Sequence, residues 1–144
     1  MKKLVELLNR QVANLGVLYV KLHNFHWLVK GPQFYQLHQL FENLYDEVTE
    51  KFDVVAERVL MLEEKPVATL KEFLQVATIK EATGTETMVA MIESVISDFK
   101  LLEKEMTEGI KLAQDLSDEV TADILIGMVA DLQKHLWMLK SVLK

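Results

Sequence analysis

Residues 23–42, HNFHWLVKGPQFYQLHQLFE, predict a tight turn between two helices. Gly31 and Pro32 mark the turn, because Gly is favoured just beyond a helix C-terminus and Pro fits the first turn of the next helix. Apolar residues recur on both sides at three- and four-residue steps, which is typical of helices that bury one face. In the first helix these positions include Leu8, Val12, Leu15, Tyr19 and Leu22. The expected helices cover Leu4–Val29 and Phe34–Leu62, as an antiparallel hairpin.

The rest of the chain predicts a second hairpin, joined to the first by a long crossover that Pro66 begins. Thr83–Glu86 has the spacing of a weak capping box, and the segment 117–119 suits a helix N-terminus. The remaining helices are expected over Leu70–Ala77, Glu86–Leu112 and Asp118–Val142. This order predicts an all-α protein, a ferritin-like four-helix bundle with a short extra helix in the long crossover connection. Residues 1–144 are expected to form one domain.

Composition excludes several classes of protein. The sequence has no cysteine, which rules out disulfides, thiolate metal sites and cysteine nucleophiles and fits the cytoplasm. A formal charge of −6, with no basic tail, favours cations over nucleic acid as partners. No apolar run approaches the roughly 20 residues of a membrane span, and Glu6 interrupts any secretory signal. We therefore expect a cytoplasmic protein with weak or no DNA binding and no membrane contact.

Histidine and acidic residues gather in the first hairpin. His26 lies five residues before Gly31 and His38 seven residues after it, so the two imidazoles are expected at similar heights. At about 100° per residue, four side chains share one flank of the second helix: His38, Glu42, Asp53 and Glu57. A mixture of imidazole and carboxylate suits iron, whereas calcium prefers oxygen ligands alone.

These ligands cannot meet around one metal ion within a single chain. His38 and Asp53 are 15 residues apart on one helix, a separation of about 22 Å at 1.5 Å per residue. The sequence also lacks the Glu-x-x-His motif of ordinary di-iron bundles. A metal site built from these residues therefore requires a second subunit.

A two-fold axis between Glu47 and Val48 would supply that subunit. If the second helix packs antiparallel against its own copy, two residues face each other when their residue numbers add up to one fixed total. The pairs that share one sum are His38 with Glu57 and Glu42 with Asp53. His26 would complete each of the two sites in the dimer. Equal sums can also arise by chance, so a histidine packed at a helix end and acids on a wet face remain the alternative.

These residues also resemble motifs of the Dps family of mini-ferritins. The resemblance covers essentially the whole chain and is carried by residues 23–27 (HNFHW), 30–34 (KGPQF), 37–38 (LH), 53–58 (DVVAER), 66–72 (PVATLKE) and 134–138 (KHLWM). It implies a hollow homododecamer with tetrahedral symmetry and ferroxidase sites at the two-fold interfaces. Its substrates would be ferrous iron and an oxidant, hydrogen peroxide in preference to oxygen, and ferric mineral would be stored inside.

The resemblance also implies roles for particular residues. The family's iron ligands fall on His26, His38, Asp53 and Glu57, and a fifth position, commonly Asp, is occupied by Glu42. The longer Glu42 side chain can still bind metal but can alter its spacing or affinity. His23 is expected to be structural or to support the ligands. Trp27 is expected either to donate an electron to reactive intermediates or to pack in the core.

Acidic pores at the three-fold axes of the family match the start of the last helix. Glu119 and Asp123 are the matching residues, while Gln114 stands where some relatives carry an acid. The alternative is that both acids only cap the helix start. Further along the same helix, His135 and Trp137 are expected to pack against the bundle.

The predicted function is therefore a ferroxidase and iron store that protects against oxidative damage. A binding-protein alternative is a DNA-binding, nucleoid-protecting role within the same family, with little dependence on ferroxidase activity. The net charge and the missing basic tail argue against it. A structural bundle without metal chemistry is a third reading, which five matched ligand positions disfavour.

Overall fold

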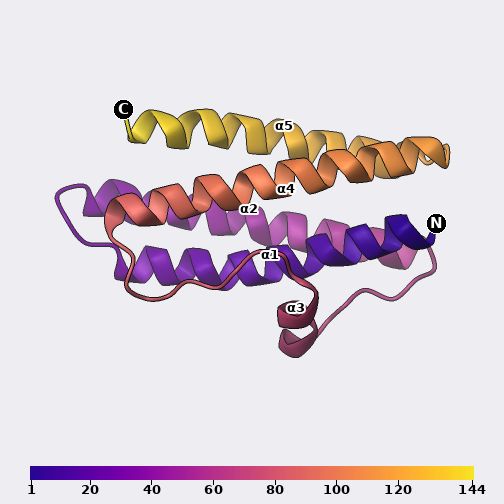
Figure 1. The fold of residues 1–144 in the computed structure, drawn as a ribbon, viewed down its shortest axis with the longest axis horizontal. Coiled ribbons are helices and arrows are strands. Elements are labelled where there is room, and N and C mark those ends of the chain that lie inside the picture. The colour runs from indigo at the N-terminus through magenta and orange to yellow at the C-terminus, as the bar shows by residue number, and fades with distance from the viewer.

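The computed structural model describes residues 1–144 and contains five helices and no strand. Four long helices lie side by side, and the short α3 sits in the crossover beside α1 (Figure 1). The helices are α1 (Lys2–Leu28), α2 (Phe34–Met61), α3 (Leu70–Val76), α4 (Met88–Asp115) and α5 (Glu119–Val142). This arrangement confirms the predicted all-α, ferritin-like bundle with an extra helix in its crossover. None of the helices combines the length and the apolar character needed to cross a membrane.

The core is built from the apolar stripes of the four long helices. The spacing predicts a stripe of eight apolar residues along α2, and six of them are buried: Leu37, Phe41, Leu44, Val48, Val55 and Val59. The other two, Phe52 and Leu62, are partly buried against the core. Phe41 packs against Phe25 of α1, with 5.7 Å between ring centroids. Tyr19 departs from its predicted stripe, because its side chain is 41% exposed and its ring lies against His23 instead of entering the core.

The crossover is held to the bundle by buried polar groups. The Asn14 carboxamide oxygen accepts hydrogen bonds from the backbone N–H groups of Thr78 and Ile79, at 2.7 and 3.0 Å. Its amide nitrogen donates to the Glu105 carboxylate of α4, as does that of Gln11. These bonds satisfy backbone donors that a loop laid over helices would otherwise bury unpaired.

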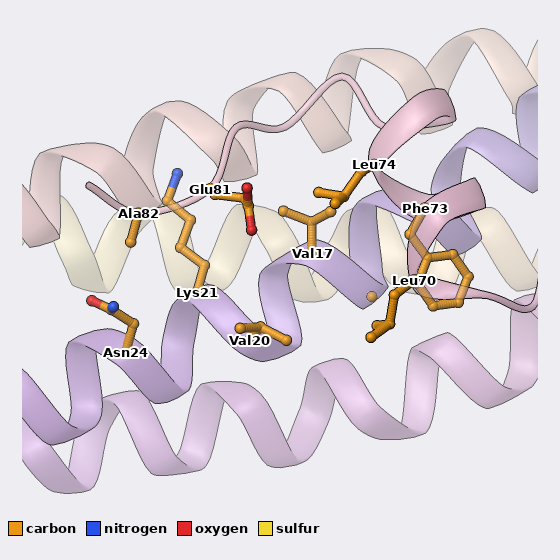
Figure 2. A pocket seen from close by; sticks show the side chains of 10 residues that line it. Val17, Val20, Lys21, Asn24, Leu70, Phe73, Leu74, Glu81 and Ala82 are labelled. Atoms are coloured by element: carbon orange, nitrogen blue, oxygen red, sulfur yellow. The ribbon is translucent and has the colours of Figure 1, made fainter. Parts of the chain in front are cut away.

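The short α3 leaves an apolar groove against α1. Its Phe73 ring lies so close to Gly16 that an added Cβ there would come within 2.8 Å of Phe73 Cδ2. Figure 2 shows the groove between α1, α3 and the returning crossover, which is lined by Val17 and Val20 of α1 and by Leu70 and Leu74 of α3. It contains none of the predicted metal ligands.

The predicted start of α4 is wrong by two residues. The Glu86 carboxylate accepts hydrogen bonds from the backbone N–H groups of Thr83 and Gly84, at 2.9 and 3.0 Å, and so belongs to the turn. Thr87 is the actual N-cap, accepting from the Ala90 N–H at 3.2 Å. The spacing of a capping box was present, but its members close the loop instead of the first helical turn.

At its other end, α4 extends three residues beyond the expected Leu112, to Asp115. The chain reverses only at Ser117, whose φ is 59°. Asp118 then caps α5 as predicted, since its carboxylate accepts from the Thr121 N–H at 3.0 Å.

Candidate metal centre

The turn between α1 and α2 brings His26 and His38 face to face. Their rings stack with 3.7 Å between centroids and 15° between planes. The Nδ1 of each ring lies 2.7 Å from the backbone carbonyl oxygen of the other residue. Because a carbonyl oxygen can only accept, each Nδ1 must carry the proton and donate it. In the neutral tautomer that donates from Nδ1, the lone pair lies on Nε2, which is the arrangement found at metal-binding histidines.

Glu42 lies on the same side as this pair. Its Oε1 is 3.9 Å from the His26 Nε2, beyond hydrogen-bond distance, and the carboxylate is partly exposed while His26 is buried. The structure thus brings three of the predicted ligands into one neighbourhood, although α1 carries one and α2 the others.

Asp53 and Glu57 do not join this group. Both side chains are exposed, further along α2. Within the chain, no group of three or more His, Asp or Glu side chains is close enough to hold a metal ion. A single chain therefore presents two partial sets of donors at separate places on α2.

Aromatic rings surround the histidine pair. Phe34 stacks on His38 with 5.1 Å between centroids, and Tyr45 meets His26 at 5.3 Å and a right angle. Phe25 and Phe41 are buried in the core and pack against each other. The contacts of Phe34 and Tyr45 restrict the orientation of the two imidazole rings.

His23 is held one helical turn before His26. Its Nδ1 donates to the Tyr19 carbonyl oxygen at 2.6 Å, and its ring stacks on Tyr45 at 3.7 Å. Core packing, one of the two expectations for Trp27, is wrong for this chain, because that side chain is 68% exposed. Its ring lies 5.4 Å from the His23 ring.

Arg58, the last residue of the 53–58 motif, links α2 to the start of α5. It donates to the Asp118 carboxylate at 3.0 Å and to the Thr121 hydroxyl at 2.8 Å. Burial alone would raise the pKa of Asp118, but hydrogen bonds from Thr121 and the Arg58 charge outweigh it and lower that pKa. The 53–58 motif predicted a ligand role for Glu57 but no role for Arg58. The role of Arg58 depends on its contact with Asp118, which lies 60 residues further along the chain.

Glu119 and Asp123 follow this cap on α5. Both are exposed, and neither side chain hydrogen-bonds or forms an ion pair within the chain. The capping bond to the helix comes from Asp118 instead. The two carboxylates are thus available at the surface.

Of the two residues expected to pack along α5, one does not. His135 is half-buried and pairs with the Glu47 carboxylate of α2, near Phe99. Trp137 is 65% exposed, because Leu136 and Leu139 are buried and Trp137 points to the other side of the helix. Packing against the bundle is therefore correct for His135 and wrong for Trp137.

Comparison with known proteins agrees with the fold and the motifs. The ferritin-like domain model matches residues 5–144, which defines the class of protein. "DNA protection during starvation protein 2" of Bacillus anthracis is 47% identical over 142 residues, 99% of this chain and 97% of the relative. A Dps structure from Bacillus brevis superposes with a TM-score of 0.98 at 50% identity, covering 99% of this chain and 96% of the other. Dps from Staphylococcus aureus gives 0.98 at 43% identity, covering 100% and 97%. The chain belongs to the Dps family of ferritin-like proteins.

Proposed function

We propose that this protein oxidises ferrous iron at sites shared between two subunits and stores the ferric product inside a dodecameric shell. The Dps family and the ferritin-like fold support a role in iron storage or DNA protection. The observation that carries the finer proposal is the hydrogen bonding of His26 and His38. Both Nδ1 protons are donated to backbone carbonyls, so both Nε2 atoms are ready to bind a cation.

A second copy of the chain would complete the site. Asp53 and Glu57 are exposed on α2, as required of residues that serve a neighbouring subunit. A two-fold axis between Glu47 and Val48 would place them opposite Glu42 and His38 of that neighbour. Each dimer then holds two sites, each with two imidazoles and three carboxylates.

The proposed chemistry uses a pair of ferrous ions as electron donors. Two Fe²⁺ ions, one hydrogen peroxide and two protons give two Fe³⁺ ions and two water molecules. Both electrons reach the peroxide together, so no hydroxyl radical is released. Carboxylates offset the added positive charge of the ferric product, and the neutral imidazoles hold iron without adding charge.

Ferrous titrations of the assembled protein test this proposal. Without oxidant, ferrous iron should bind saturably; peroxide should then oxidise it faster than air does, with little hydroxyl radical detected by a spin trap. A protein that shows no saturable ferrous binding, or that oxidises iron no faster than buffer, would refute the ferroxidase proposal.

DNA protection by direct binding is the second candidate, because the names of four relatives state DNA protection. A formal charge of −6 per chain repels phosphate. We therefore expect weak or no mobility shift of duplex DNA at physiological salt, with a chelator present so that divalent ions cannot bridge the two anions. A tight, salt-sensitive complex under these conditions would show that direct binding contributes to protection.

We also propose that Glu119 and Asp123 line a channel for iron at each three-fold axis. Three copies of two free carboxylates would concentrate ferrous ions at its mouth. Replacing them by Gln and Asn should slow iron oxidation about 10-fold at low ionic strength, and added salt should shrink the difference. Stopped-flow absorbance would measure both rates, on shells whose mass light scattering confirms as about 200 kDa, twelve times the 16.6 kDa subunit. Equal rates at low salt would place iron entry elsewhere.

A further inference from the structure

Arg58 holds the first turn of α5 against α2 and takes no part in the proposed reaction. The turn between α4 and α5 lies at the same end of the bundle as the C-terminal end of α2 (Figure 1). There the Arg58 Nη2 donates to the Asp118 Oδ1 at 3.0 Å, and its Nε donates to the Thr121 hydroxyl at 2.8 Å. Thr121 is fully buried, and the side chains of Arg58 and Asp118 are each only 14% exposed. Water therefore competes little for these bonds.

The two contacts attach one helical turn at two points. Asp118 is the N-cap of α5, where its carboxylate also accepts from the Thr121 N–H at 3.0 Å, and Thr121 is the third residue of the helix. Attachment at the cap and at the third residue fixes both where the turn lies and how it is rotated about the helix axis. Because α5 packs along α4, Arg58 supplies the connection of this turn to α2.

The proposed channel carboxylates project from the same part of α5. Glu119 is the first residue of the helix, and Asp123 lies four residues further on. At about 100° per residue, both point away from the side that Arg58 holds, which agrees with their exposure. Three copies of each carboxylate concentrate cations only where they converge, because the attraction falls with distance. A shift or rotation of this turn would therefore weaken the field at the mouth of the channel.

We propose that Arg58 is a positioning residue for iron entry, which holds Glu119 and Asp123 at the channel through its bonds to the first turn of α5. The inference rests on the proposed channel, and Arg58 acts through the two carboxylates and not by contact with iron. Its planar guanidinium can donate to two acceptors at once in a fixed geometry, which the ammonium of a lysine does less well. Asp118 balances its charge, so Arg58 adds little repulsion to an entering cation.

Initial rates of peroxide-driven oxidation over a range of ferrous concentrations, on assembled shells, test this role. Arg58→Gln removes both contacts and should lower kcat/KM for ferrous iron about threefold at low ionic strength, less than the roughly 10-fold expected when both carboxylates are lost. The kcat at saturating iron should not change, because the metal sites still fill when iron is abundant. Arg58→Lys keeps the charge beside Asp118 and should recover part of the loss.

Thr121→Val tests the same role with Arg58 in place. Valine keeps the shape of the buried side chain and removes one of the two attachments, so kcat/KM should fall by a smaller factor in the same direction while kcat stays unchanged. This variant decides the question if Arg58→Gln does not form the shell.

Lys51→Gln is the matched control. Lys51 also joins α2 to α5, through an ion pair with Asp131 at 3.1 Å, and its side chain has the same 14% exposure as that of Arg58. The substitution removes the same charge from the same pair of helices, away from the first turn of α5, so kcat and kcat/KM should both stay as in the wild type. Circular dichroism and light scattering check that each variant folds and forms the shell.

The outcomes separate the role of Arg58 from the proposed channel. If neutralising Glu119 and Asp123 leaves kcat/KM unchanged at low ionic strength, the channel proposal fails, and the role of Arg58 fails with it. If that double variant is slow but Arg58→Gln keeps or raises kcat/KM, the role of Arg58 alone is overturned; a rise is the result expected if only its positive charge matters. Equal losses in kcat and kcat/KM would also overturn it, because they would mean fewer active shells and not slower entry.

Discussion

Replacing His38 by Ala should lower the initial rate of peroxide-driven iron oxidation by about 100-fold or more, since loss of even an outer-shell partner typically costs 10- to 100-fold. The change removes one proposed ligand, and it also removes the hydrogen bond that His38 donates to the His26 carbonyl oxygen. Stopped-flow absorbance on assembled shells would measure the rate. His135→Gln is the matched control, because His135 pairs with Glu47 away from the site and Gln can still hydrogen-bond.

Mixed assemblies give the sharper form of this test. One variant loses His26 and His38, the other loses Asp53 and Glu57, and each alone should be inactive. In a dimer of one chain of each kind, one of the two shared sites regains all of its ligands. Activity should therefore return on mixing under conditions that reassemble the shell, with mixed dimers verified by mass. Continued inactivity in verified mixed dimers would contradict a site shared between subunits.

Helix positions were predictable from sequence because the buried apolar residues of a helix recur at three- and four-residue steps. The α2 stripe and the turn at Gly31 followed from spacing and from local backbone preference. The structure explains the choice of Gly31 further, since its φ is 127° and an added Cβ would approach Met88 Cε to 2.5 Å. Local rules failed at Glu86, where a side chain had two sets of backbone donors within reach and bonded to those of the turn.

The histidine pair was predictable for a related reason. A short turn places residues at similar distances from it side by side, so His26 and His38 follow from the hairpin alone. Their reciprocal Nδ1 bonds did not follow, because backbone carbonyl positions depend on how α1 and α2 cross. The relation of Asp53 and Glu57 to the pair depends on a second chain, which one sequence specifies only through the sum of residue numbers.

Buried polar contacts between distant segments left no sequence signal. Asn14 and Glu105 look like surface residues of amphipathic helices, yet together they anchor the crossover. The buried ion pair of Lys21 with Asp98 is another contact between distant segments of this kind. Such pairs have no fixed spacing, because their geometry depends on the crossing of helices far apart in the chain.

Lys21→Met should destabilise the protein by about 3–5 kcal/mol, because it leaves a buried carboxylate without its partner. The Lys21 Nζ lies 2.7 Å from the Asp98 Oδ2 and donates to the Lys80 carbonyl oxygen at 2.8 Å. Lys21 is only 5% exposed and Asp98 9%, so water cannot replace the lost ammonium. The melting temperature should fall by about 10 °C or more at neutral pH, measured at fixed subunit concentration because assembly also stabilises the fold.

The pH dependence of this loss identifies its cause. Burial raises the pKa of Asp98, although Lys21 lowers it in part. A carboxyl with a raised pKa contributes its full stabilisation below its pKa in the unfolded chain. That stabilisation is lost as the pH rises through its pKa in the folded protein. Without Lys21 the folded pKa rises further. The deficit of Lys21→Met relative to wild type should therefore be largest at neutral pH and shrink as the pH falls and Asp98 takes up a proton.

Lys21→Met combined with Asp98→Leu removes both charges and should recover most of the lost stability at every pH. Two results would contradict this explanation: a deficit that does not change with pH, or a double variant as unstable as the single one. Either would mean that Lys21 stabilises the fold through the packing of its side chain and its bond to the crossover, and not by neutralising Asp98.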